Sequence, residues 1–220
     1  PIAGLESIED AVGRATEMGR PLMFVPGWGT LGDPDTVASM MILGQVAKKA
    51  AEFDVRLISP HCDYMVMPMA QEIVQNAFNE VGRPDAYNPN DIFFVSYDQF
   101  PFCAGVNGLT VRERVATIFY MGFFNAEALL LTETGNQTGA FQIAGTDAIT
   151  QVPFFITTCS YTLIGEEFYA ASAYISRNPD LVSMLKASDY FKVIIVAVII
   201  IGTLLASFNL TGFINAFPIE

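Results

Sequence analysis

Residues 21–32 read PLMFVPGWGTLG, and this stretch decides the fold. A short apolar run, residues 21–26, leads directly into a cluster of three glycines. The run shows no alternation of polar and apolar residues, which is typical of a strand buried on both faces. Residues 35–53 follow with helical spacing, with an acid at the start and lysines in the last turns, as the helix dipole favours. We therefore predict a strand, a glycine turn and a helix.

The same alternation continues in both directions along the chain. A capping-box pattern predicts a helix over residues 8–18, ahead of the first strand. Further strands are expected at residues 55–59, 92–96, 126–132 and 154–158. Further helices are expected at residues 67–81, 111–122, 140–149, 163–175 and from 178 to about 186. The sequence thus predicts an α/β, Rossmann-like, doubly wound fold with a mostly parallel five-stranded sheet.

Residues 190–210, YFKVIIVAVIIIGTLLASFNL, form a long apolar stretch, and no charge occurs between Lys192 and Glu220. At ~1.5 Å per residue a helix of this length covers ~30 Å, which matches the hydrocarbon core of a bilayer. A buried core helix of this length would normally show a polar face. We therefore predict an α/β domain over residues 1–187, a transmembrane helix over 188–210 and an extracytoplasmic tail over 211–220, with the lipid bilayer as a partner.

A second span over residues 117–131 is the competing interpretation of another apolar stretch. That stretch is short and contains Gly122, Asn125 and Glu127. A buried carboxylate in lipid is costly, so a helix, a turn and a strand are favoured there.

The few cations near the predicted span indicate its orientation. Arg177, Lys186 and Lys192 lie on its N-terminal side, and Glu220 is the only charge after it. The positive-inside tendency therefore places the domain in the cytoplasm, at the plasma membrane (the inner membrane of a cell with two). Three cysteines, far apart and odd in number, fit a reducing compartment. Because the sequence begins at Pro1 without a methionine, a preceding segment is compatible with it.

The charge balance limits the classes of partner. The chain has 11 Lys and Arg against 23 Asp and Glu, for a net charge of −12. So few cations cannot build a phosphate-neutralising stripe, which argues against nucleic acid as a partner. The same balance argues against a domain that lies flat on anionic lipid.

The glycine turn is a G-x-G-x-x-G between a predicted strand and a predicted helix. In this context glycines let a backbone approach a pyrophosphate at a helix N-terminus. Asp33 and Asp35 at the helix start would repel phosphate, and Trp28 is bulky. Two interpretations stay open, a structural turn and a nucleotide-binding turn. The binding interpretation would use Gly27, Trp28, Gly29, Thr30 and Gly32.

Polar residues follow the predicted strands. The loops after parallel strands meet at the carboxyl edge of a sheet, where ligands bind. The candidate binding residues beyond the glycine turn are His61, Asp63, Asp98 and Glu133. These loops carry no Lys or Arg that could offset a phosphate, so the three acids would suit a neutral or cationic ligand.

The sequence contains no complete catalytic or metal-binding pattern. The single histidine excludes a two-histidine metal site, and there is no C-x-x-C pair, Walker lysine or G-x-S-x-G. His61 and Cys62 are adjacent and therefore point apart, which does not suit a dyad. We predict no catalytic residue, no metal and no cofactor, with a nucleotide as the open alternative.

Several segments together resemble a bacterial membrane-anchored family of uncharacterised function. They are residues 20–35, GFFNAEALLLTETG (122–135), CSYTLIGEEFYAASAYIS (159–176) and the apolar stretch that follows. The resemblance implies the anchored α/β architecture and supplies no catalytic residue. Some relatives have a second span ahead of the domain.

Two functional hypotheses follow. The first is a structural or scaffolding subunit that assembles at the membrane with copies of itself or with other subunits, and small residues along the span would allow close helix packing. The alternative is a domain, enzymatic or non-catalytic, that binds a nucleotide or a small ligand through the glycine turn.

Overall fold

Six parallel strands form one sheet in the order β3-β2-β1-β4-β5-β6 in the computed structural model, which describes residues 3–176 and 179–207. The strands are β1 Leu22–Val25, β2 Leu57–His61, β3 Ile92–Phe94, β4 Thr117–Met121, β5 Phe141–Thr146 and β6 Tyr161–Ile164. The chain divides into two units, residues 1–176 and 177–220, and the sheet belongs to the first.

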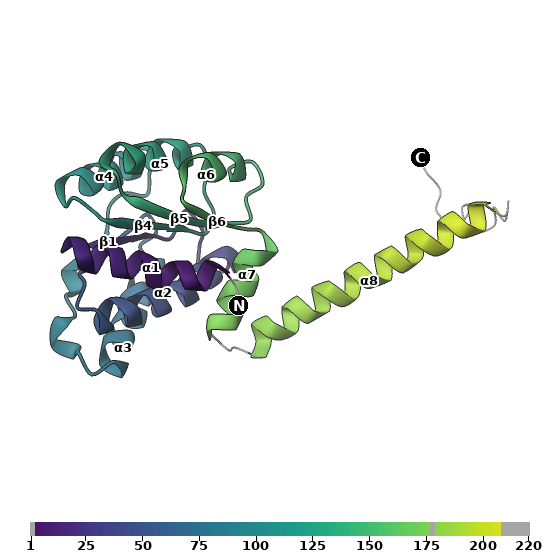
Figure 1. Cartoon of the computed structure of the whole chain (residues 1–220), viewed down its shortest axis with the longest axis horizontal. Helices are drawn as coiled ribbons and strands as arrows, with labels where there is room; N and C mark the ends of the chain where they lie inside the picture. The colour runs from purple at the N-terminus through teal and green to yellow at the C-terminus, as the bar shows by residue number, and fades with distance from the viewer. Residues whose placement is uncertain (1–2, 177–178, 208–220) are drawn as a thin grey trace. The chain divides into compact units, whose positions relative to one another are not determined.

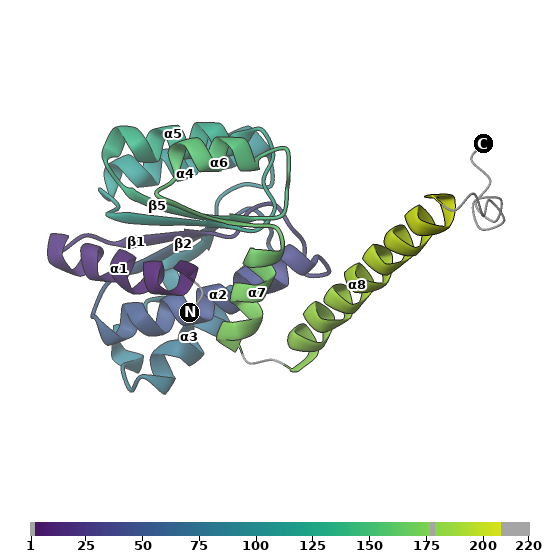
Figure 2. The ribbon, with the colours of Figure 1, turned by 45° about the vertical axis from the view of Figure 1, so that its right-hand side comes forward.

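Helices cover both faces of the sheet (Figure 1, Figure 2). One layer contains α1 Ala3–Met18, α2 Pro34–Glu52, α3 Val66–Glu80 and α7 Glu166–Ser176. The other contains α4 Gln99–Arg112, α5 Glu127–Thr138 and α6 Val152–Thr158. Two short 3₁₀ turns, η1 Pro84–Ala86 and η2 Pro89–Asp91, precede β3. The predicted α/β fold with a parallel sheet is confirmed.

The central strands are buried on both faces, as their unbroken apolar sequences predict. In β1, Leu22 and Phe24 pack into the core beneath α1, α2 and α3. Met23 and Val25 point the other way, into the core beneath α4 and α5. The neighbouring strands extend both faces in the same way. Burial of their apolar surface contributes about 25 cal/mol per Å² and so stabilises the packing of both helix layers on the sheet.

The first part of the chain follows the prediction closely, and the part from residue 97 to 158 does not. The predicted helix over 111–122 is strand β4, and the predicted strand over 126–132 lies largely in α5. The predicted helix over 140–149 is replaced by β5, and the predicted strand over 154–158 belongs to α6. A short run in which every residue is apolar shows no hydrophobic periodicity, so its sequence pattern does not distinguish a strand from a helix. The β-branched and aromatic residues of TIFYM suit a strand, and the leucines of α5 suit a helix.

The sheet has six strands rather than the predicted five. Strand β6 occupies the boundary where the sequence pattern predicted the start of a helix, and that helix begins only at Glu166. Helix α4 was not predicted because Pro101, Gly105 and Gly108 lower its helix propensity. Strand β2 extends two residues beyond its predicted end and includes His61.

The second unit contains α8, Pro179–Ser207, which is continuous where a short helix and a separate span were predicted. Residues 185–205 of this helix have a mean hydropathy of 2.0, and none of the window is buried. Among the described residues, α8 is the one helix long and apolar enough to cross a membrane. The competing span over 117–131 is divided between β4 and α5. Arg177, residues 208–210 and the predicted tail lie outside the described residues.

Candidate functional site

The strand order reverses between β1 and β4, and ligands of open α/β sheets bind at the carboxyl ends of such strands. In this chain the two loops that follow β1 and β4 contact each other there. The backbone N–H of Trp28 donates to the carbonyl oxygen of Phe123 at 2.8 Å. A Cβ at Gly27 (φ +76°) would clash with that same carbonyl, and one at Gly122 (φ +122°) would clash with the carbonyl of Pro26. The glycines at this point therefore permit a backbone-to-backbone contact.

The rest of the glycine turn is also held by contacts within the chain. Thr30 donates to Oδ2 of Asp33 from its backbone N–H at 2.7 Å and from its hydroxyl at 2.9 Å. These hydrogen bonds hold the pKa of Asp33 below its ordinary value. Ser39 in α2 donates to the carbonyl oxygen of Met121 at 2.9 Å, which fixes the start of α2 over the end of β4. A Cβ at Gly29 would meet the hydroxyl of Thr36.

Asp35, in the first turn of α2, and Asp147 both contact the hydroxyl of Tyr169. The hydroxyl of Tyr169 in α7 lies 2.7 Å from Oδ2 of Asp147 and also contacts Oδ1 of Asp35. A hydroxyl has one proton, so Tyr169 can donate to only one of these two carboxylates at a time. The geometry therefore favours protonation of one of the two carboxyl groups. Burial raises the pKa of Asp35, and the neighbouring Asp147 raises it further. The position where a Rossmann domain would bind pyrophosphate therefore contains an acidic cluster of the chain itself.

His61 and Cys62 lie on opposite faces of the sheet. His61 is fully buried at the end of β2, with Nε2 3.0 Å from the hydroxyl of Ser59, and burial lowers its pKa to about 3. Cys62 donates to the carbonyl oxygen of Gly27 at 3.0 Å, and burial raises its pKa to about 12. At neutral pH the imidazole is uncharged and the thiol is protonated, which does not suit nucleophilic catalysis.

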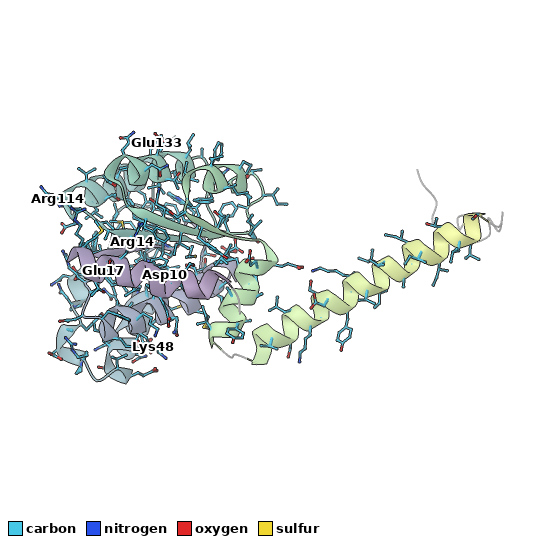
Figure 3. All side chains as sticks on the ribbon, viewed as in Figure 1. Asp10, Arg14, Glu17, Lys48, Arg114 and Glu133 are labelled. Atoms are coloured by element: carbon cyan, nitrogen blue, oxygen red, sulfur yellow. The ribbon has the colours of Figure 1, made fainter. Side chains whose placement is uncertain are left out.

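The structure brings two of the three predicted acids to the carboxyl edge. Asp63 accepts hydrogen bonds from the backbone N–H groups of Met65 (2.6 Å) and Val66 (3.0 Å) and so caps the start of α3. Asp98 precedes α4 with its side chain exposed. Glu133 lies in the middle of α5 on the outer surface (Figure 3), because the predicted strand before it is a helix. Glu133 is therefore not at the carboxyl edge.

Sequence reasoning named Trp28 but missed the other aromatic side chains of this edge. The ring of Trp28 makes edge-on contacts with Phe102 (5.7 Å between centroids) and Tyr97 (6.5 Å). Tyr64, Tyr97 and Phe100 are each 63% exposed. The recurrence of aromatic residues just after the predicted second and third strands was the signal that could have indicated them.

A buried glutamate connects the loops beneath these aromatic residues. Glu127, fully buried at the start of α5, accepts from the backbone N–H of Asn125 at 2.9 Å and from the side-chain amide of Gln99 at the start of α4. The contact holds the loops after β3 and β4 together. This contact explains why the apolar stretch 117–131 contains a carboxylate although the stretch belongs to the α/β domain and is not a membrane span.

Charge is distributed unevenly between the two edges of the sheet. Within the described range 3–176, every Lys and Arg lies in a segment that leads into the amino end of a strand (Figure 3 labels three of them). They are Arg14, Arg20, Lys48, Lys49, Arg56, Arg83, Arg112 and Arg114. The carboxyl edge in that range has carboxylates and no cation. In the described parts of the chain no group of His, Cys, Asp or Glu side chains is arranged to hold a metal ion.

The strand order, the parallel pairing and the helices on both faces define a Rossmann-like α/β domain. The chain belongs to the family described as a domain of unknown function, DUF6754, whose model matches residues 1–217. No curated protein and no solved structure matches the chain.

Proposed function

We propose that the chain is a non-catalytic α/β subunit, anchored in a membrane by α8, that assembles with copies of itself or with other membrane proteins. The observation that carries the proposal is the contact between Trp28 and Phe123 at the point where the strand order reverses. This contact gives the glycine turn a structural role at the place where a Rossmann enzyme would hold its cofactor.

The electrostatics of the α2 start support the same proposal. A phosphate there would face the carboxylates of Asp33 and Asp35. Two unit charges ~4 Å apart repel by about 1–4 kcal/mol at effective dielectrics of ~80 to ~20. This repulsion offsets the attraction of the helix dipole, which is typically about 0.3–1 kcal/mol.

The exposed apolar helix supports the membrane anchor. A window of 21 residues spans ~30 Å at ~1.5 Å per residue, and no part of it is buried within the chain. Such a surface is favourable in lipid and costly in water. We propose that the domain faces the cytoplasm at the plasma membrane, because Lys186 and Lys192 lie at the N-terminal end of the apolar part of α8.

The mass of the detergent-extracted particle tests the assembly. We expect multi-angle light scattering, corrected for bound detergent, to give a particle heavier than one chain of 24.0 kDa, or a complex with other membrane proteins. A monomer at micromolar concentration that retains no partner after mild extraction would contradict the proposal.

A nucleotide-binding domain is the second candidate, favoured by the strand order and by the position of the glycine turn. The matched experiment combines mass spectrometry of retained small molecules with thermal-shift titration of NAD, ATP and cyclic nucleotides. Under the first proposal no nucleotide is retained, and millimolar nucleotide leaves the unfolding temperature unchanged. A saturable rise would favour the second candidate instead.

A further inference from the structure

Aromatic and apolar side chains gather where four neighbouring strands end, on the loops that follow them and, for Phe100, in the first turn of α4. This surface, the aromatic edge, is made by the half-buried Trp28 and the exposed Tyr64, Met65, Tyr97, Phe100 and Phe123. The loops that carry it contact one another. Trp28 packs against Tyr97, and its backbone binds Phe123, so the loops after β1, β3 and β4 form one continuous surface. Cys62 donates to Gly27 and so joins the loop after β2 to the same surface.

Carboxylates are interspersed among these aromatic residues. Asp33, Asp63 and Asp98 lie on the loops after β1, β2 and β3, and Asp33 and Asp98 are exposed. Within residues 3–176 no Lys or Arg lies on these loops. The edge therefore combines ring faces with negative charge and contains no cation of its own among the described residues.

We propose that the aromatic edge binds a basic polypeptide segment of a partner membrane protein. Guanidinium and ammonium groups stack on aromatic faces and pair with carboxylates, and Arg does both with one planar group. Aromatic side chains dominate the binding energy of protein interfaces. Loops of membrane proteins near the cytoplasmic surface are enriched in Lys and Arg, so such segments lie within reach of an anchored cytoplasmic domain. This inference rests on the proposed function.

A second copy of the chain is a poorer occupant. Within residues 3–176 its cations lie at the amino edge, and most of them are paired with acids of the same chain. The pairs are Lys48–Glu80, Lys49–Glu9, Arg56–Asp91, Arg83–Asp54 and Arg112–Glu113. Binding them to the aromatic edge of another copy would require breaking these contacts. A separate basic segment needs no such exchange.

The binding test uses the full chain in nanodiscs of phosphatidylcholine, a neutral lipid that does not attract a basic peptide. Octa-arginine is the probe, and the fluorescence of Trp28, the only tryptophan of the chain, is the readout at the aromatic edge. We expect a saturable change. The double variant Y97A/F100A and the variant D98K should each weaken the apparent affinity by about tenfold, which is about 1.4 kcal/mol, because each removes cation–π or ion-pair contacts with the peptide.

The variant E133K is the matched control. It makes the same charge reversal as D98K, but on the outer surface of α5 (Figure 3), and should change the affinity by less than about twofold at ~0.15 M salt because of screening. Thermal unfolding of each variant, followed by circular dichroism, verifies that these exposed substitutions leave the fold intact.

Three results would overturn the proposal. They are no saturable change, an equal loss of affinity in E133K and D98K, and a fluorescence change that appears without peptide when the chain is concentrated, which would identify a second copy as the occupant. None of these results bears on the proposed assembly, which is tested separately by the mass of the detergent-extracted particle. A monomeric particle that still binds octa-arginine at this edge would contradict the assembly alone.

Discussion

The backbone N–H of Trp28 donates to the carbonyl oxygen of Phe123 at 2.8 Å, across 95 positions of sequence, and joins the loops after β1 and β4. In an open α/β sheet these two loops usually separate around a ligand. Here their contact depends on Gly27 and Gly122, where any side chain would clash with the opposite backbone. A motif that resembles a cofactor fingerprint thus makes a backbone packing contact within the chain.

The first prediction concerns this contact. Replacing Gly27 with Ala should destabilise the domain by about 2–4 kcal/mol, because Gly27 has a positive φ and its new Cβ would meet backbone, which cannot rotate away. Urea unfolding followed by circular dichroism measures the change. The control is Gly13→Ala in α1, where nothing lies within 4 Å and the helix should gain up to about 1 kcal/mol. Equal stability of the two variants would contradict the packing role.

The second prediction concerns Arg56, which bridges the segments before β2, β3 and β4. Its guanidinium donates to Asp91 through Nε (3.0 Å) and Nη2 (2.6 Å), and to Glu113 through Nη1 at 2.9 Å. Arg56→Ala leaves the buried Asp91 without this partner and should cost about 1–3 kcal/mol. Arg83→Ala breaks the exposed pair with Asp54 and should cost less than about 1 kcal/mol. Urea unfolding measures the loss of stability in both variants. A loss in Arg56→Ala no larger than in Arg83→Ala would show that the Arg56 hydrogen bonds do not stabilise the domain.

The third prediction concerns the pH dependence of Asp35. Its pKa is raised by burial, so its contribution to stability is fully present below the unfolded pKa of ~3.9 and is lost as pH rises through the folded value. Asp35→Asn cannot titrate and keeps an acceptor for Tyr169. Its stability relative to the natural chain should therefore increase as pH rises from about 4 towards neutrality.

Asp33→Asn is the control for that experiment, with the opposite sign. Hydrogen bonds from Thr30 lower the pKa of Asp33, so its contribution is present above the unfolded pKa and is lost as pH falls through the folded value. Urea unfolding from about pH 2 to pH 7 measures both variants, because the Asp33 contribution changes only below the unfolded pKa of ~3.9. A difference between Asp35→Asn and the natural chain that does not change with pH would show that Asp35 titrates normally.

The fourth prediction concerns the three free cysteines. Burial raises the pKa of Cys62 and Cys159 to about 12 and that of Cys103 to about 11. At pH 8 the thiolate fraction of each is therefore at least ~100-fold below that of an ordinary thiol with a pKa of ~8.5. Ellman's reagent should label the folded protein correspondingly slowly and label all three sites on unfolding. Rapid labelling of one cysteine in the folded chain would reveal a reactive site.

The fifth prediction concerns the orientation of the anchor. Protease added to sealed inverted membrane vesicles should digest the α/β domain, and protease added to intact spheroplasts should leave it whole, because the cations of α8, Lys186 and Lys192, lie in the N-terminal part of its apolar window. Detergent-opened spheroplasts serve as the control for protease activity. The reverse pattern would place the domain outside the cytoplasm.

Local pattern was sufficient for the elements that carry an unambiguous signal. The glycine turn after β1, the helical spacing and terminal charges of α2, and the apolar length of α8 are properties of contiguous residues. Such signals predicted the α/β class, the parallel sheet and the candidate span. They failed from residue 97 to 158, because a short buried run such as TIFYM has the same apolar composition in a strand and in a helix.

The sequence by itself determined the layer architecture and the chemical character of α8, since both depend on periodicity and on apolar length along the chain. Only the tertiary structure decided the order of the six strands and the identity of β4 as a strand between β1 and β5. It alone brought Tyr169 to Asp35 and Trp28 to Tyr97. These contacts join segments far apart in sequence, and their energy arises from burial and hydrogen bonding in three dimensions, which no local pattern records.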